Sequence, residues 1–187
     1  LKANIPIDAS KAASILRNRK GVGGAELGLA NEMAINQFIA HHSVIFQPEK
    51  KLMWVSTSPW QCGKYVAYDL NRIFSDSIDF NHEIYTGDLT LPADSFLQQQ
   101  EYQQLMAYKR LAPVLRKQIK KKERLDEQTL HAFQHANPHF FYVYELLGDY
   151  YHATGQQDKA LRNWKKALLL PIPKRSESER IEHKINN

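Results

Sequence analysis

The chain has 187 residues, of which 43% are hydrophobic and 24% charged, so it can bury the core of one domain or of a domain and a half. Its net charge is +5, from 25 Lys and Arg against 20 Asp and Glu, and the basic run at 116–124 (RKQIKKKER) is typical of a solvated helix face. Because that run is not interleaved with aromatic residues in a recognisable module, no nucleic-acid partner is predicted, and because no apolar run approaches roughly 20 residues, no transmembrane segment is predicted either.

The first predicted element is a short helix over Asp8–Arg19. Asp8 is a suitable N-cap, and the apolar residues after it recur at helical spacing. The glycine-rich stretch 20–24 ends this helix, because Gly readily adopts the positive φ of a helix terminus. No strand precedes these glycines and no Lys-Ser/Thr pair follows them, so we interpret them as a loop rather than a phosphate cradle. A second, short and irregular helix is predicted over Glu26–Asn36.

Two strands joined by a turn come next. His42–Phe46 and Leu52–Ser56 are rich in β-branched and aromatic residues, and Pro48 between them favours a turn. Both strands are apolar at nearly every position, which predicts burial on both faces, as in the inner sheet of a layered fold. A third short strand is predicted over Lys64–Leu70. Since an isolated hairpin is only marginally stable in water, we expect this sheet to complete a larger one whose other strands lie outside these residues.

The remainder of the chain is predicted to be helical. The boundary between the sheet-bearing part and the all-helical part is expected near Leu91. A long helix is predicted over 94–122, with Pro113 kinking or dividing it, because proline removes a backbone donor and clashes with the preceding turn. Another helix is predicted over 126–136, with Asp126 or the residue before it at its start.

Residues 138–173 resemble a single tetratricopeptide repeat. The matching positions are Tyr144, Leu147, Gly148, Tyr151, Gly155, Ala160, Trp164, Ala167 and either Pro171 or Pro173. Gly148 and Ala160 are small where the two helices approach closely, and Gly155 permits the turn between them. Such repeats usually occur in arrays of about three or more, because one unit cannot cover its own apolar face. Three interpretations therefore stay open: a lid packed on its own protein, a groove for a partner peptide, and a dimerisation surface.

Few residues suggest chemistry by type and spacing alone. Cys62 is the one cysteine, which excludes an internal disulfide and a cysteine-rich zinc site. His41 and His42 could approach it as a base, but a buried structural cysteine is the favoured interpretation. His131 and His135 share a helix face, yet their segment, HAFQH, lacks the glutamate of an HExxH zinc motif. We interpret this pair as solvent-facing and predict no metal site.

A family resemblance covers Asp8–Leu70. It is carried in chain order by SKAASILRNRKG, by ANEMAINQ, by the paired segments HHSVIF and KLMWVSTSPW around QPEKK, and by KYVAYDL. With the Ser58-Pro59 step after the second strand, this segment resembles the C-terminal part of acyl-coenzyme A:6-aminopenicillanic acid acyltransferase-like proteins. The helical tail is an addition, similar to the repeat-bearing versions found in some bacteria.

The resemblance implies an α+β fold of the N-terminal-nucleophile class, with two stacked sheets between helical layers (αββα). In that family the chain cleaves itself and exposes a cysteine whose own α-amino group is the general base. Cys62 lies inside the chain and does not fit this role, and the chain begins with Leu1. We therefore expect the nucleophile in residues before Leu1 and predict no catalytic residue here. Where some family members have an arginine, this sequence has Asn36 and Gln37.

The resemblance also implies a site. The residues expected to line its cleft and to orient an amide or acyl substrate are Asn36, Gln37, His41, His42 and Ser43. Strand alternation would put His41 and Ser43 on one face of the sheet and His42 on the other, so one histidine is expected to be buried or to lie at the cleft.

The sequence thus predicts a small antiparallel sheet in 1–91, as the C-terminal segment of the hydrolase fold, and a helical tail in 92–187 with its repeat-like unit at 138–173. No cofactor is predicted. The expected partners are the N-terminal part of the same protein or a second copy, with a small amide or acyl substrate in the full protein. Periplasm and cytoplasm both remain open as compartments. The alternative function is a non-enzymatic protein-interaction module built on the tail helices.

Overall fold

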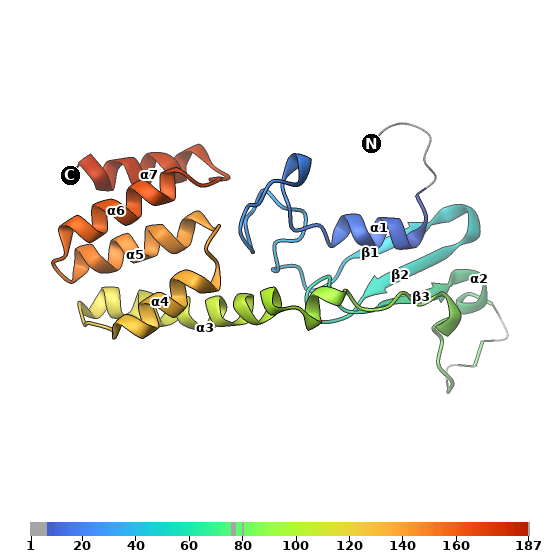
Figure 1. Cartoon of the computed structure of the whole chain (residues 1–187). Helices are drawn as coiled ribbons and strands as arrows, with labels where there is room; N and C mark the ends of the chain where they lie inside the picture. Colours follow the sequence, from blue (N-terminus) through green and yellow to red (C-terminus); the bar gives the residue numbers. More distant parts are fainter. Residues whose placement is uncertain (1–6, 76–77, 80, 187) are drawn as a thin grey trace. The chain divides into compact units, whose positions relative to one another are not determined.

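The computed structural model of the chain describes residues 7–75, 78–79 and 81–186 (Figure 1). Within these residues it contains seven α-helices and one three-stranded antiparallel sheet, which confirms the predicted α+β class. The chain forms two compact units. We call Leu1–Asn18 with Ile35–Leu97 the sheet unit, and Arg19–Ala34 with Gln98–Asn187 the helical unit.

The sheet has the strand order β1-β2-β3, and its bounds are β1 (Val44–Gln47), β2 (Leu52–Ser56) and β3 (Tyr65–Asp69). All three predicted strands are confirmed, although β1 begins two residues later than expected. A single 3-10 turn over Pro48–Lys50 joins β1 to β2, and Lys51 closes it with a left-handed φ of 51°. The register pairs Ile45 with Trp54 and Trp54 with Ala67, so these three side chains share one face of the sheet.

Helix α1 (Ala9–Leu16) covers that face. Asp8 caps it as predicted, because its side chain accepts a hydrogen bond of 2.7 Å from the backbone N–H of Lys11. The core between helix and sheet consists of Ala13, Ile45, Trp54, Tyr65 and Ala67. The small Ala13 lets the helix approach the sheet closely, and the indole N–H of Trp54 donates to the carbonyl of Leu89 at 2.8 Å.

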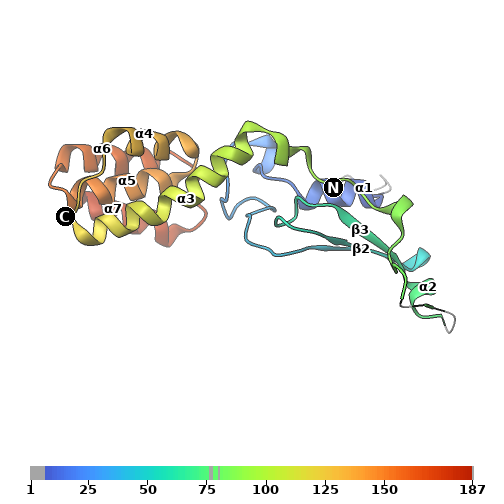
Figure 2. The ribbon, with the colours of Figure 1, turned by 90° about the horizontal axis from the view of Figure 1, so that it is seen from below.

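The second face of the sheet is apolar and remains partly exposed. The prediction that both faces would be buried is therefore wrong for the described chain, in which 61% of Phe46 and 37% of Val44 are accessible to solvent. The physical reason is that α1 packs on one face only, and Figure 2 shows the sheet with α1 on a single side.

A short helix, α2 (Leu70–Ile73), follows β3 directly. Asp69, at the end of β3, caps it by accepting a 2.9 Å hydrogen bond from the N–H of Asn71. The rest of the link to the helical unit is irregular where it is described, apart from 3-10 turns at Gly87–Leu89 and Ser95–Gln98. The sequence analysis did not predict α2.

The helix predicted over Glu26–Asn36 is wrong, since this segment has no helix. Gly28 and Ala30 have left-handed φ angles of 77° and 69°, which interrupt a right-handed helix. The segment is instead held by Asn137, whose side chain donates to the carbonyl of Leu29 at 2.7 Å and accepts from its N–H at 2.9 Å. This reciprocal pair gives the backbone of Leu29 the partners that a regular element would have supplied.

The helical unit consists of α3 (Gln100–Lys121), α4 (Glu127–Ala136), α5 (Phe141–Ala153), α6 (Gln157–Leu168) and α7 (Arg175–Asn186). Helix α3 begins later than predicted and runs through Pro113 without being divided there. Helix α4 has the predicted cap, since Asp126 accepts a 2.7 Å hydrogen bond from the N–H of Thr129. No helix in the described ranges is both long and apolar enough to cross a membrane.

Helices α5 and α6 form a tightly packed pair inside residues 138–173. Gly148 is required at their contact, because a Cβ there would lie 2.3 Å from Cδ1 of Trp164. Trp164 is buried, and its indole N–H donates to Asp149 at 3.0 Å. The helix–turn–helix is therefore present, while its assignment as a tetratricopeptide unit stays a prediction.

Helix α7 packs on α5 through buried charge. Glu145 is 2% exposed and accepts two 2.8 Å hydrogen bonds from Arg180 and one of 2.7 Å from Lys184. Burial raises the pKa of the Glu145 carboxyl, but the hydrogen bonds and charges of Arg180 and Lys184 outweigh it, so the pKa lies below its ordinary value. Lys184 also donates to Asp149 at 2.8 Å, and the network fixes α7 against the preceding helices.

Candidate functional site

The five residues predicted to bind substrate all lie in the connector that leads into β1. Asn36 is 1% exposed, and Gln37 and Ser43 are half-buried. His41 and His42 are both exposed, so burial of one of them is ruled out, while the alternative, a place at the cleft, stays a prediction. The reason is that β1 begins at Val44, and the two histidines precede the part of the chain that alternates between sheet faces.

Asn36 holds this connector against the loop before β3. Its Nδ2 lies 3.4 Å from Sγ of Cys62, and its Oδ1 accepts a 3.1 Å hydrogen bond from the N–H of Phe38. Phe38 has a left-handed φ of 54° and packs its ring edge-on against Trp60, with ring centres 5.6 Å apart. Both polar atoms of the Asn36 side chain therefore already have partners within the protein, and its role in binding a substrate stays a prediction.

Cys62 is fully buried, with 0% of its surface exposed. A nucleophilic cysteine needs access to its substrate and an environment that stabilises the thiolate. The amide group of Asn36 is uncharged, and both neighbouring histidines of the sequence argument are at the surface. This environment fits the structural role that the sequence analysis favoured.

A hydroxyl cluster lies where the connector enters the sheet. The backbone N–H of Ser43 donates to Oγ of Ser56 at 2.7 Å, and Ser43 Oγ forms a hydrogen bond with the hydroxyl of Tyr65. Burial raises the pKa of Tyr65 above its ordinary value, while the hydrogen bond with Ser43 and the charge of Arg17 partly oppose this. Of this cluster the sequence analysis identified only Ser43.

Arg17 joins the cluster from the end of α1. Its guanidinium donates to the carbonyls of Gln61 at 3.2 Å, Gly63 at 2.7 Å and Pro92 at 2.8 Å, and it lies 5.0 Å from the ring centre of Tyr65. One cation therefore ties three carbonyls of the loops beside β3. No local pattern predicts this role of Arg17, because its partners lie 44 to 75 residues away along the chain.

The open face of the sheet, which α1 does not cover, carries apolar side chains from all three strands. Six cross-strand neighbours form two rows on it: Val44, Val55 and Val66 in one, and Phe46, Met53 and Tyr68 in the other. Four of the six are half-buried, and Val44 and Phe46 are exposed. Monomeric proteins seldom leave a contiguous apolar surface of this kind uncovered, and two packed sheets interdigitate such rows about 10 Å apart.

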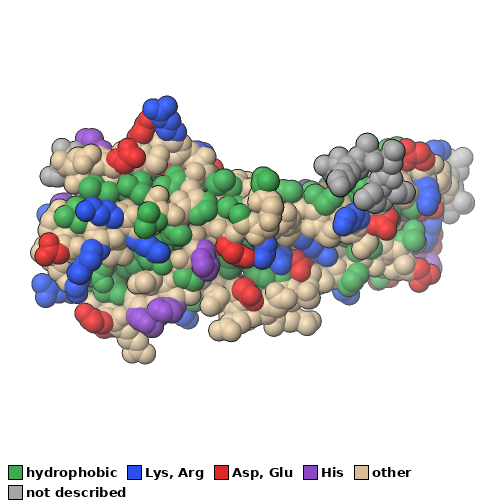
Figure 3. Space-filling model, turned by 45° about the horizontal axis from the view of Figure 1, so that its top comes forward, with side chains coloured by type: hydrophobic (Ala, Val, Ile, Leu, Met, Phe, Trp, Pro, Cys, Tyr) green, Lys and Arg blue, Asp and Glu red, His purple; other side chains and the backbone are tan. Residues whose placement is uncertain are grey.

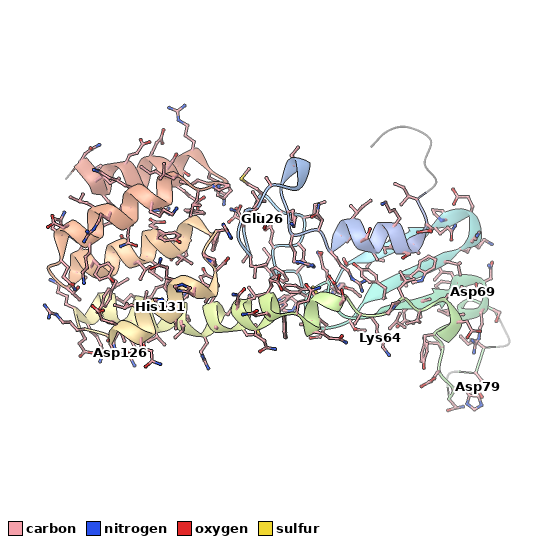
Figure 4. The ribbon with its side chains drawn as sticks, viewed as in Figure 1. Glu26, Lys64, Asp69, Asp79, Asp126 and His131 are labelled. Atoms are coloured by element: carbon pink, nitrogen blue, oxygen red, sulfur yellow. The ribbon has the colours of Figure 1, made fainter. Side chains whose placement is uncertain are left out.

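In the helical unit, the sequence analysis singled out His131 and His135. Figure 4 labels Asp126, the N-cap of α4, and His131, which lies on α4. His131 and His135 are both exposed, with ring centres 3.8 Å apart, which agrees with a solvent-facing pair. Among the residues the structure describes, no group of three or more His, Cys, Asp or Glu side chains is arranged to hold a metal ion. On the face shown in Figure 3, Lys and Arg side chains are interspersed with acidic and uncharged ones.

Comparison of the chain with protein-family models, with curated proteins and with solved structures gave no match in any of the three.

Proposed function

We propose that the sheet unit is the C-terminal, non-nucleophile portion of a cysteine amidohydrolase or acyltransferase of the N-terminal-nucleophile class. The observation that carries this proposal is the asymmetry of the three-stranded sheet. One face is covered by α1, and the other presents two apolar rows to solvent. A sheet in an αββα sandwich needs this division, because a helical layer packs on one side and the second sheet on the other.

The proposal gives the connector residues different roles. Asn36 and Ser43 hold the connector on the sheet through Cys62, Ser56 and Tyr65. The exposed side chains are those of His41 and His42, which can orient an amide or acyl group at the cleft wall. Attack on the substrate carbonyl is assigned to a cysteine at a newly formed N-terminus, outside these 187 residues.

The experiment uses the complete reading frame that encodes this chain. Expression is followed by intact mass measurement, N-terminal sequencing and an amide-hydrolysis assay on a panel of N-acyl substrates. We expect self-cleavage that exposes a cysteine, and hydrolysis that is lost when this cysteine is replaced by Ala but kept in Cys62→Ala. An uncleaved product without hydrolysis would contradict the proposal, and so would turnover by the present chain that Cys62→Ala abolishes.

A second candidate, a protein-interaction module, is favoured by the α5–α6 pair. Gly148 meets Trp164 at positions that the tetratricopeptide resemblance implies, and such pairs commonly present a partner surface. Burial raises the pKa of the Tyr151 hydroxyl, and the charge of Arg162, which is exposed on α6, partly opposes this. The test is a pulldown with the unchanged chain and two variants of α6. If Arg162→Glu loses one stably bound protein that Lys165→Glu, also at an exposed position, retains, the result supports this candidate. Equal capture by both variants would oppose it.

A further inference from the structure

The helical unit contains a pocket of about 240 Å³. Four aromatic residues and two carboxylates dominate its lining: Tyr108, Phe140, Phe141, Tyr142, Glu32 and Glu177. This volume equals the share of roughly eight liquid waters and lies below the range of about 300–1,000 Å³ for drug-sized or cofactor sites. The pocket therefore suits a group the size of one side chain.

Residues of α3, α5 and α7 and of the loops around Glu32, Phe140 and Pro173 build the pocket, and several of these walls have fixing contacts of their own. The ring of Tyr108 on α3 meets Phe140 edge-on with centres 5.8 Å apart, and Phe140 meets Phe141 edge-on at 5.3 Å. The loop that brings Glu32 is held by Asn31, whose side chain donates to the carbonyl of Pro171 at 3.0 Å. The walls are thus positioned without a ligand, which reduces the ordering that binding requires.

The two carboxylates differ in their partners. Glu32 forms a 2.5 Å salt bridge with Lys174, and both side chains are about half exposed, so water and salt screen this pair. Oε2 of Glu177, by contrast, is buried and has no hydrogen-bond partner in the part of the chain that is described. The charges of Lys174 and Arg180 both act on Glu177, but Lys174 pairs with Glu32 and Arg180 is bound bidentately to Glu145. A buried carboxylate oxygen in this situation favours a cationic partner.

We propose that this pocket binds an alkylammonium group, with the aromatic rings around the cation and Glu177 as its counter-charge. Aromatic faces attract ammonium and quaternary ammonium ions through the ring quadrupole, and desolvation strengthens this attraction. The group can belong to a lysine side chain of a polypeptide or to a free small amine. The proposal rests on neither function proposed above, because every residue it uses lies in the helical unit.

The test is a titration of the full chain, followed by NMR shifts of the amides of Phe141, Tyr142 and Glu177 and by calorimetry. One arm uses choline with its neutral isostere 3,3-dimethylbutan-1-ol, and the other uses Nα-acetyl-lysine methylamide with its norleucine analogue. We expect saturable one-to-one binding of at least one cation, with binding of its neutral analogue at least about tenfold weaker. The stronger arm identifies the source, a free ammonium compound or a polypeptide side chain.

Glu177→Gln is expected to weaken binding by about tenfold or more, since it removes the counter-charge. Glu179→Gln, on the same helix but paired with Arg175 outside the pocket, is the matched control and should bind as the unchanged chain does. Tyr142→Leu removes one half-buried ring and should also weaken binding, which keeps the test valid if Glu177→Gln does not fold. No saturable shift with either cation, equal binding of the neutral analogues, or unchanged affinity in the folded Glu177→Gln or Tyr142→Leu variant would overturn the proposal.

Discussion

The substitution Phe46→Ala tests whether the sheet face that carries Phe46 is covered or open to solvent. Phe→Ala at a fully buried position costs about 3–5 kcal/mol of unfolding free energy. Because 61% of Phe46 is exposed, only about two-fifths of that contact is present in this chain. We therefore expect a loss of about 1–2 kcal/mol in the chain alone, and the full loss of about 3–5 kcal/mol in the protein from the complete reading frame, where the proposed second sheet covers the ring.

The neighbouring residue on the other face is the control. Ile45 is 8% exposed and packs under α1, so Ile45→Ala should cost about 2–5 kcal/mol in both proteins. The assay is equilibrium denaturation in urea, followed by circular dichroism, on the unchanged chain and both variants in both contexts. A Phe46→Ala loss above about 3 kcal/mol in the chain alone would show that the face is already covered, and an equal loss in both proteins would refute the proposed second sheet.

Three further predictions concern the helical unit. Gly148→Ala should lower the free energy of unfolding by about 1–3 kcal/mol in a thermal unfolding experiment, because the added Cβ meets Trp164. The control is Gly87→Ala, where the added Cβ would have a Tyr85 ring atom at 3.8 Å as its nearest contact; it should change the free energy of unfolding by less than about 0.5 kcal/mol. Asn137→Ala should lower the free energy of unfolding by about 1–3 kcal/mol and speed hydrogen exchange at the Leu29 amide. An unchanged exchange rate would contradict the conclusion that Asn137 holds this segment in place. Since the folded pKa of Glu145 is depressed, its stabilising contribution is present above the unfolded pKa of about 4.3 and is lost as pH falls through the lower folded value. The melting temperature should therefore fall less between pH 5 and pH 2 in Glu145→Gln than in the unchanged chain, and parallel curves would contradict this.

The parts of the fold that the sequence predicted correctly depend on local rules. Asp8 and Asp126 are side chains that cap the helix beginning directly after them, so the rule needs only neighbouring residues. The three strands were recognisable because β-branched and aromatic residues cluster in short runs. The close contact at Gly148 followed from the helix–turn–helix spacing.

The parts that were missed depend on contacts between distant residues. Asn137 holds Leu29 from 108 positions away along the chain, and no local sequence pattern indicates that the segment around Leu29 is irregular rather than helical. Helix α7 is strongly polar, with Ile181 as its one fully buried side chain, so few apolar residues mark it in the sequence. It forms because buried Glu145 supplies the partner for its cations.

The candidate site shows the same division. The connector residues were located by resemblance, but strand alternation was applied to His41 and His42, which precede the strand. Arg17 and Tyr65 could not be identified, because their partners come together only after the sheet forms. Apolar residues at nearly every strand position predict burial on both faces, but this pattern does not show which element covers the second face.

The most direct test of the proposed sheet packing is thiol labelling of Phe46→Cys. Cys62, the one cysteine of this chain, is fully buried and should react slowly, so the introduced thiol reports on the open face. In the complete protein, the label on residue 46 is measured by peptide mass analysis, which separates it from the proposed nucleophile. We expect fast labelling in the chain alone at both low and high protein concentration, and labelling slowed by about a hundredfold or more in the folded protein from the complete reading frame. Protection that rises with the concentration of the chain alone would indicate a second copy on this face, and fast labelling in the complete protein would contradict the proposed sandwich.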